Sequence, residues 1–348
     1  MSAHGRLQIN EHALKQTAVL IRLDKIGDLV STIPVDEHEL LKDYEISWVI
    51  SKGMGFIAEQ ALPQRKYLEL NAKSKLISLI KLIQFLKLKK PSLAISFQAP
   101  WWVTFALWFT GIPVRAGTKS QWHSFLFLNR GLRQKRSQAT QHESSYNLDL
   151  LFYAFEKQNS KPELAAKLKL QASVEIKISK WDLSTKKYFV VHPGMAGSAL
   201  NWKIQNYIDL IKQLKNQSPV VITGTLADES WLTEIKKEFQ LNPQVKILQN
   251  KLTSLELLSV LKEARAVIAP STGVLHLAAA LGTKSIGIYS PVQVQNQIRW
   301  KARGDLVTIF APSIQCPAQF YCLETKCKDF YCLDQVKVET VLKESLGT

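Results

Sequence analysis

The sequence contains no apolar run that approaches the roughly 18 uninterrupted residues of a membrane-spanning helix. Residues 1–16 (MSAHGRLQINEHALKQ) also lack the apolar core of a secretory signal peptide. These two absences argue against a membrane-spanning or secreted protein, so we expect the chain to stay in the cytoplasm.

Cysteine is scarce and confined to one segment. The chain has 4 cysteines, Cys316, Cys322, Cys327 and Cys332, and no pair has the two-residue spacing of a Cys-x-x-Cys zinc knuckle. Disulfide bonds are rare in the cytoplasm. Two interpretations remain, a structural zinc site and a set of reduced, packed thiols.

Acidic residues are absent between Leu70 and His142, where lysine and arginine are abundant. The whole chain carries a formal net charge of +16, so this segment concentrates a positive field in the first half. Such a field favours an acidic partner, which is a nucleic acid, an anionic membrane or a phosphorylated substrate. The simpler alternative is a solvated, solubilising surface.

The length and the apolar pattern predict two α/β domains. A chain of 348 residues with 46% hydrophobic residues is long enough for two cores. Strand patterns alternate with helical segments in both halves; they cover residues 18–23, 46–50, 67–70, 93–97 and 113–117, and then 188–192, 220–223, 245–248, 266–269 and 285–289. We therefore predict two doubly wound Rossmann-like domains facing a cleft, at residues 1–160 and 188–348. A polar linker with one short strand joins them at 161–187.

Two helical segments in the first half are unusually apolar or basic. Residues 73–90 combine six lysines with a broad apolar face, and residues 101–109 (WWVTFALWF) are almost wholly apolar. The common explanation is a pair of helices packed on a sheet. The alternative is attachment to an anionic membrane, aided by the aromatic loop at 119–136.

One stretch, residues 269–291 (APSTGVLHLAAALGTKSIGIYSP), has the pattern strand, turn, helix, strand. The first N–H groups of such a helix have no intrahelical partner and suit a phosphate. Ser271 and Thr272 are candidate caps, Gly273 permits close approach of a ligand, and His276 is a candidate hydrogen-bond donor. An ordinary capped helix with a satisfied histidine is the alternative.

This stretch resembles the C-terminal signature of the bacterial ADP-heptose:lipopolysaccharide heptosyltransferases, glycosyltransferase family 9. Three further segments match in the expected order, residues 21–34 (IRLDKIGDLVSTIP), 191–202 (VHPGMAGSALNW) and 252–261 (LTSLELLSVL). The resemblance spans nearly the whole chain and implies the GT-B arrangement of two Rossmann-like domains.

The resemblance also implies a catalytic base. Asp28 matches the aspartate of the family's Ile-Gly-Asp element and takes the proton of the acceptor hydroxyl, with Lys25 and Gly27 as candidate acceptor contacts. The alternative is that Asp28 caps a helix beginning at Leu29. The sequence has no Asp-x-Asp pair of the kind that metal-dependent sugar transferases carry, so we expect catalysis without a cofactor.

The donor site implied by the resemblance lies in the second domain, at the diphosphate-binding stretch and the loop after residue 192. Its candidate contacts are Gly194, Gly197, Ser198, Asn201, Trp202, Lys203, Asp228, Ser271, Thr272, Gly273 and His276. Asp228 or Glu229 is a candidate ribose ligand, although acids in a first helical turn are common partners of the helix dipole. Leu200 and Ser271 stand where the family often has a cation and an aspartate, and Lys203 is the candidate replacement for the missing cation.

Together these observations predict an inverting, metal-independent glycosyltransferase. Its expected partners are an ADP-linked heptose-like donor, a phosphorylated glycolipid acceptor of the lipopolysaccharide inner core and an anionic membrane surface, with no nucleic acid. The enzymatic alternatives are transfer of another nucleotide sugar and a nucleotide-sugar epimerase of the same architecture. The non-enzymatic alternative is a nucleic-acid- or membrane-binding protein, whose binding depends on salt and not on nucleotide sugars.

Overall fold

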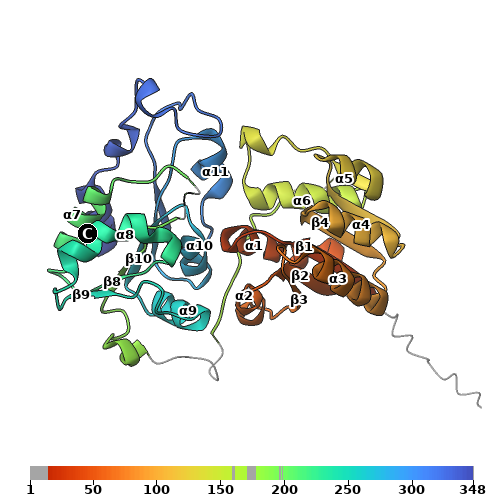
Figure 1. The fold of residues 1–348 in the computed structure, drawn as a ribbon, viewed down its shortest axis with the longest axis horizontal. Helices are drawn as coiled ribbons and strands as arrows, with labels where there is room; N and C mark the ends of the chain where they lie inside the picture. The colour runs from red at the N-terminus through yellow and green to blue at the C-terminus, as the bar shows by residue number, and fades with distance from the viewer. Residues whose placement is uncertain (1–14, 159–160, 171–177, 196, 198, 348) are drawn as a thin grey trace, which may run out of the picture.

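The computed structural model describes residues 15–158, 161–170, 178–195, 197 and 199–347 (Figure 1). They form two α/β domains, each built on a six-stranded parallel sheet. The predicted fold class is confirmed. No helix in these described ranges is long and apolar enough to cross a membrane.

The first domain has strand order β3-β2-β1-β4-β5-β6. Its strands are β1 (Gln16–Arg22), β2 (Tyr44–Ser51), β3 (Lys66–Leu70), β4 (Leu93–Gln98), β5 (Val114–Thr118) and β6 (Arg130–Leu132). Helices α1 (Ile26–Thr32), α2 (Gly55–Gln60) and α6 (Glu143–Ala154) share a core with one face of this sheet. Helices α3 (Lys75–Lys89) and α4 (Trp101–Phe109) pack on the other face, and α5 (Trp122–Phe127) packs against α4.

The second domain has strand order β12-β11-β10-β7-β8-β9. Its strands are β7 (Phe189–Val191), β8 (Val220–Ile222), β9 (Val245–Ile247), β10 (Ala266–Pro270), β11 (Ser285–Ile288) and β12 (Val307–Phe310). Its helices are α7 (Ile204–Leu214), α8 (Glu229–Phe239), α9 (Ser254–Lys262), α10 (Gly273–Ala280), α11 (Gln297–Trp300) and α12 (Val338–Leu346). The last helix, α12, packs on α7.

Short 3₁₀ helices complete the described structure. They are η1 (Ile33–Glu37), η2 (Glu39–Leu41), η3 (Arg136–Gln138), η5 (Ile178–Trp181), η6 (Leu226–Asp228), η7 (Gln293–Gln295), η8 (Glu324–Lys326) and η9 (Cys332–Gln335). The described part of the predicted linker holds η5 and one antiparallel bridge, between Leu168 and Ala61. The rest of the expected linker strand lies outside the described residues.

The two domains meet through α1 and α10, which lie side by side in the centre of the molecule (Figure 1). One buried apolar cluster continues from the first domain into α9 and α10 of the second. Each of these helices follows a central strand of its sheet. The carboxyl ends of parallel strands are where α/β proteins place their ligands, so this boundary positions the site.

Candidate functional site

A buried arginine ends strand β1 and gathers acidic side chains at the carboxyl edge of the first sheet. Arg22, 1% exposed, donates from Nη2 to Asp28 Oδ1 (2.5 Å) and from Nη1 to Glu143 Oε1 (3.2 Å). Its Nε lies 2.8 Å from Asp24 Oδ2, without hydrogen-bond alignment. Burial raises the pKa of Asp24 to about 6, although Arg22 opposes the shift. One guanidinium therefore binds two carboxylates through hydrogen bonds and forms an ion pair with a third.

Asp28 does not cap a helix. Helix α1 begins at Ile26, its N-cap residue is Lys25, and Asp28 lies in the first turn, so the alternative in which Asp28 caps a helix beginning at Leu29 is wrong. Arg22 instead holds one oxygen of the Asp28 carboxylate with a charge-assisted hydrogen bond. The side chain remains 19% exposed. Asp28 is thus an oriented carboxylate that is accessible to a substrate.

Glu143, the first residue of α6, is fully buried among three arginines. Its Oε1 accepts from Arg22 and Arg136, and its Oε2 accepts from Arg299 Nε at 2.9 Å. Burial alone raises the pKa of a carboxyl group, but the arginines outweigh it and lower the pKa of Glu143 to about 2. Arg299 belongs to α11 of the second domain. Glu143 is therefore an ionised group shared by both domains.

His276 lies at the domain boundary, in the first half of α10. A Cβ atom placed on Gly27 would lie 3.1 Å from His276 Cδ2, and one placed on Gly273 would lie 2.7 Å from Ile26 Cβ. A side chain at Gly273 would force α1 and α10 apart, and one at Gly27 would fit tightly against His276. Burial lowers the pKa of His276 to about 4, with nearby Asp28 opposing the shift. The imidazole is therefore neutral at pH 7, and Gly27 contacts the second domain.

The N-terminus of α10 follows strand β10 directly. Thr272 occupies the N-cap position in an extended conformation (φ −139°, ψ 161°), and its side chain makes no cap hydrogen bond. The predicted cap by Thr272 is therefore not formed. The first N–H groups of a helix have no intrahelical acceptor. The first N–H groups of α10, next to His276, therefore stay the candidate anion site.

The loop after β7 has a more structural role than we predicted. Asn201 is buried, donates to Pro193 O (2.7 Å) and accepts from Tyr207 Oη (3.0 Å). Trp202 is fully buried, and its indole N–H donates to Val336 O. Its side chain is therefore not accessible to a nucleotide sugar, which disagrees with the prediction. Lys203 pairs with Asp334 at 2.6 Å on a partly exposed surface, and its role as the replacement cation stays a prediction.

Gly194 packs directly on Asp228. A Cβ atom at Gly194 would lie 2.2 Å from Asp228 Cγ, so a larger residue does not fit. Asp228 is 2% exposed and accepts bonds from Thr225 N and Oγ1 in a capping box. This structural role competes with the predicted ribose contact, which stays a prediction. Gly197 has a φ of +71°, a conformation that favours glycine, and Ser198 lies outside the described residues.

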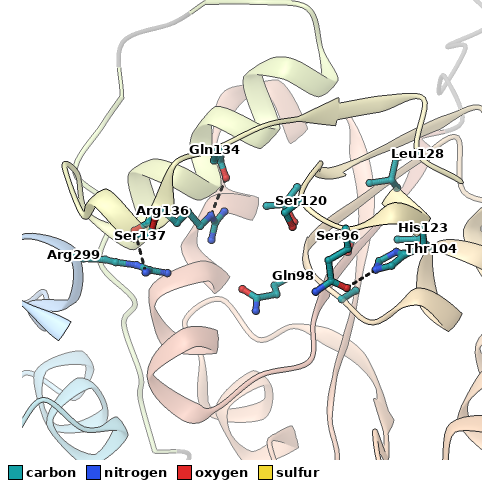
Figure 2. A pocket seen from close by; sticks show the side chains of 13 residues that line it. Ser96, Gln98, Thr104, Ser120, His123, Leu128, Gln134, Arg136, Ser137 and Arg299 are labelled. Carbon is teal, nitrogen blue, oxygen red and sulfur yellow. Dashed lines mark hydrogen bonds between the residues drawn. The ribbon is translucent and has the colours of Figure 1, made fainter. Parts of the chain in front are cut away.

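A polar pocket of about 260 Å³ lies at the carboxyl ends of β4 and β5, and no sequence motif predicted it (Figure 2). It is lined by Ser96, Gln98, Ala99, Thr104, Thr118, Ser120, Gln121, His123, Leu128, Gln134, Arg136, Ser137 and Arg299. Figure 2 shows Arg299 extending from the second domain toward Arg136. Burial lowers the pKa of Arg136 to about 10, although Glu143 opposes the shift, so it stays cationic at pH 7. In the sequence, this region is distinguished only by the absence of acidic residues between Leu70 and His142.

The four cysteines are free thiols in the structure. Burial raises the pKa of the Cys316 and Cys332 thiols, and neighbouring cysteines add to the shift. Within the ranges that the structure describes, no group of three or more His, Cys, Asp or Glu residues has a geometry that holds a metal ion. The zinc alternative therefore gains no support from this geometry.

Comparison with known proteins gives a consistent result. The sequence model described as "Glycosyltransferase family 9 (heptosyltransferase)" matches residues 79–327. A Haemophilus influenzae protein named "Putative glycosyltransferase" is 29% identical over 209 residues, which are 57% of this chain and 60% of that protein. This chain thus matches less than two thirds of that relative's length.

Solved structures share the fold. A Veillonella parvula family 9 glycosyltransferase has a TM-score of 0.76 at 15% identity, covering 96% of this chain and 98% of its own. The Escherichia coli ADP-heptose lipopolysaccharide heptosyltransferase II has a TM-score of 0.76 at 17% identity, covering 95% and 98%. E. coli heptosyltransferase WaaC, solved with ADP-2-deoxy-2-fluoro heptose, has a TM-score of 0.64 at 17% identity, covering 94% and 98%.

Proposed function

The chain belongs to glycosyltransferase family 9, and we propose that it transfers a heptose-like sugar from an ADP-linked donor to a phosphorylated glycolipid of the lipopolysaccharide inner core. We further propose that the reaction inverts the anomeric centre and needs no metal ion. The observation that carries the proposal is the position of Asp28. Its carboxylate, oriented by Arg22, lies in the helix that packs on the N-terminus of α10.

The proposed reaction is a single displacement. Asp28 takes the proton from the acceptor hydroxyl, whose oxygen attacks the anomeric carbon from the face opposite the diphosphate. The bond from the anomeric carbon to the diphosphate oxygen breaks, and its electron pair leaves with ADP. The N–H groups at the start of α10 stabilise the charge that develops on the diphosphate. The absence of an Asp-x-Asp pair supports this division of roles.

The acceptor is proposed to enter the pocket between β4, β5 and α11. Arg136 and Arg299 line this pocket together with neutral polar groups such as Gln98 and Ser120. Guanidinium groups recognise phosphate with paired N–H donors, and the phosphorylated glycolipid is the acidic partner that the composition favours. Lys25, the N-cap of α1, is exposed beside Asp28 and stays a candidate acceptor contact.

The nucleotide is the part of the donor best suited to a first experiment. Because a ligand that binds only the folded state raises apparent stability, we expect ADP to raise the melting temperature more than GDP or UDP. Leu200 and Ser271 lack charge, and Lys203 is paired elsewhere, so sugar selectivity is expected to be looser than nucleotide selectivity. Stabilisation by UDP with no effect of ADP would contradict the proposed donor.

Substitution of His276 tests the diphosphate contact. The neutral imidazole can still donate to the negatively charged diphosphate, and we expect His276→Ala to lose this charge-assisted hydrogen bond. The expected cost is about 1.5 to 3 kcal/mol in ADP affinity, or roughly 10- to 150-fold in Kd, measured by isothermal titration calorimetry. An unchanged Kd would leave His276 with a packing role alone.

The surface of the first domain supports a peripheral location on the inner face of the inner membrane. Helices α3, α4 and α5 lie on the side away from the second domain (Figure 1). They expose large aliphatic and aromatic residues, which are Leu76, Ile77, Ile80, Leu88, Trp101, Trp108, Phe109, Trp122, Phe125 and Leu126. The Nζ atom of Lys87 lies 5.8 Å from the ring centroid of Phe109, and that of Lys119 lies 4.9 Å from the ring centroid of Phe125. Aromatic rings flanked by lysines suit an anionic lipid surface.

Vesicle flotation tests this location. We expect recovery with anionic vesicles at low salt and much less with neutral vesicles or at high salt, because the charge attraction is screened. The double variant Trp122→Gln/Leu126→Gln should float poorly. Leu241→Gln, at a residue 92% exposed on the second domain, is the matched control and should behave as wild type. Equal recovery with both lipid types at both salt concentrations would reject the electrostatic mechanism.

A further inference from the structure

A continuous set of buried contacts joins the second domain to Asp28. Arg299 Nε donates to Glu143 Oε2 (2.9 Å), and Arg299 Nη1 donates to the carbonyl of Arg136 (3.2 Å). Glu143 Oε1 accepts from Arg22 Nη1 (3.2 Å), and Arg22 Nη2 donates to Asp28 Oδ1 (2.5 Å). Arg22 and Glu143, at 1% and 0% side-chain exposure, are fully buried, whereas Asp28, Arg299 and Arg136 are 19%, 13% and 11% exposed.

The formal charges of this cluster balance only when both domains contribute. The first domain supplies two cations, Arg22 and Arg136, and three carboxylates, Asp24, Asp28 and Glu143. Arg299 of the second domain supplies the third cation. A buried carboxylate that loses a partner carries a large desolvation penalty. Without Arg299, Glu143 therefore competes more strongly for the guanidinium of Arg22, which also holds Asp28.

We infer that Arg299 is a positioning residue for the transfer reaction, which acts through Glu143 and Arg22 to fix the carboxylate of Asp28. The inference rests on the proposed role of Asp28 as the base. In this arrangement the base reaches its catalytic orientation only when the second domain, which holds the donor, is docked on the first. Approach of the donor domain and orientation of the base thus become one event.

A second contact between the domains provides a matched control. Gln293 Nε2 donates to the carbonyl of Gln138 at 3.0 Å, linking η7 of the second domain to the end of η3. This bond crosses the same boundary without touching Glu143, Arg22 or Asp28. A variant at Gln293 therefore reports what the loss of a contact between the domains does by itself.

The test compares Arg299→Gln, Gln293→Ala and Asp28→Asn with the double variant Asp28→Asn/Arg299→Gln. Because a misplaced catalytic group costs up to about 100-fold in rate, we expect Arg299→Gln to lower kcat about 10- to 100-fold at saturating donor and acceptor. The donor KM should change less than about threefold. Gln293→Ala should stay within about twofold of wild type. The double variant should be no slower than Asp28→Asn alone, since residues that act as one unit are not additive.

Three outcomes overturn the inference: an Arg299→Gln kcat within about twofold of wild type, a loss equal to that of Gln293→Ala, or a full additional loss on the Asp28→Asn background. If the first of these comes with a higher acceptor KM, Arg299 is an acceptor contact in the pocket. Failure of the proposed function gives a different pattern, because Asp28→Asn itself would then turn over at a near-normal rate.

Discussion

The Asp28→Asn variant is expected to lose transfer activity by about 10²- to 10⁴-fold, the usual contribution of a positioned general base. Asparagine retains the oxygen that accepts from Arg22 Nη2, so the orientation of the side chain should survive while its basicity is lost. Affinity for ADP should stay nearly unchanged, because the nucleotide is proposed to bind at α10 in the other domain. Steady-state kinetics and nucleotide titration measure the two effects separately.

Asp24→Asn is the matched control for this substitution. Asp24 Oδ2 lies 2.8 Å from Arg22 Nε, so the variant removes one carboxylate charge from the same arginine without removing the proposed base. We expect a much smaller change in kcat than in Asp28→Asn. Equal losses in the two variants would show that the charge around Arg22, and not proton transfer to Asp28, limits the reaction.

The Glu143→Gln variant is expected to lose about 3 to 5 kcal/mol of unfolding free energy at pH 7, because it leaves buried arginines without their shared carboxylate. Urea unfolding measures this loss. Glu45→Gln is the control, since Glu45 pairs with Lys66 on an exposed surface, at 46% and 68% exposure, where an ion pair contributes little. A Glu143→Gln protein as stable as wild type would contradict the described charge cluster.

The same variant has an expected pH dependence. The pKa of Glu143 falls from 4.5 to about 2 on folding, which corresponds to about 3 kcal/mol of stability. A lowered folded-state pKa gives stability that is fully present above pH 4.5 and is lost as the pH falls toward 2. The difference between wild type and Glu143→Gln should therefore narrow on acidification below pH 4.5. A stability difference between the two proteins that grows below pH 4.5 would contradict the lowered pKa of Glu143.

The position of most strands followed from the sequence because their apolar runs are long and fully buried. Strands β6 and β12 were not predicted, since Arg130–Leu132 and Val307–Phe310 are short, half-buried edge strands. The start of α1 was placed three residues late, at Leu29 instead of Ile26. A polar residue before an apolar run resembles a cap, and only the structure shows that Arg22 binds its carboxylate.

The charge cluster could not be predicted from the sequence because its members are far apart in the chain. Glu143 lies 121 residues from Arg22 and 156 residues from Arg299, and no spacing rule connects them. In the loop before α7, by contrast, a sequence motif predicted donor contacts that the structure does not favour. Trp202 is buried in the core, and Asn201 is buried between the Pro193 carbonyl and Tyr207.

The most direct measurement of the proposed function is transfer from ADP-heptose to a lipopolysaccharide acceptor that lacks inner-core heptose. Mass spectrometry of the glycolipid and quantification of released nucleotide report both products of one reaction. The account predicts one added heptose for each ADP released, with inverted anomeric configuration and no loss of rate in the presence of a chelator. Extension of the glycolipid from a UDP-sugar, with ADP-heptose left unused, would contradict it.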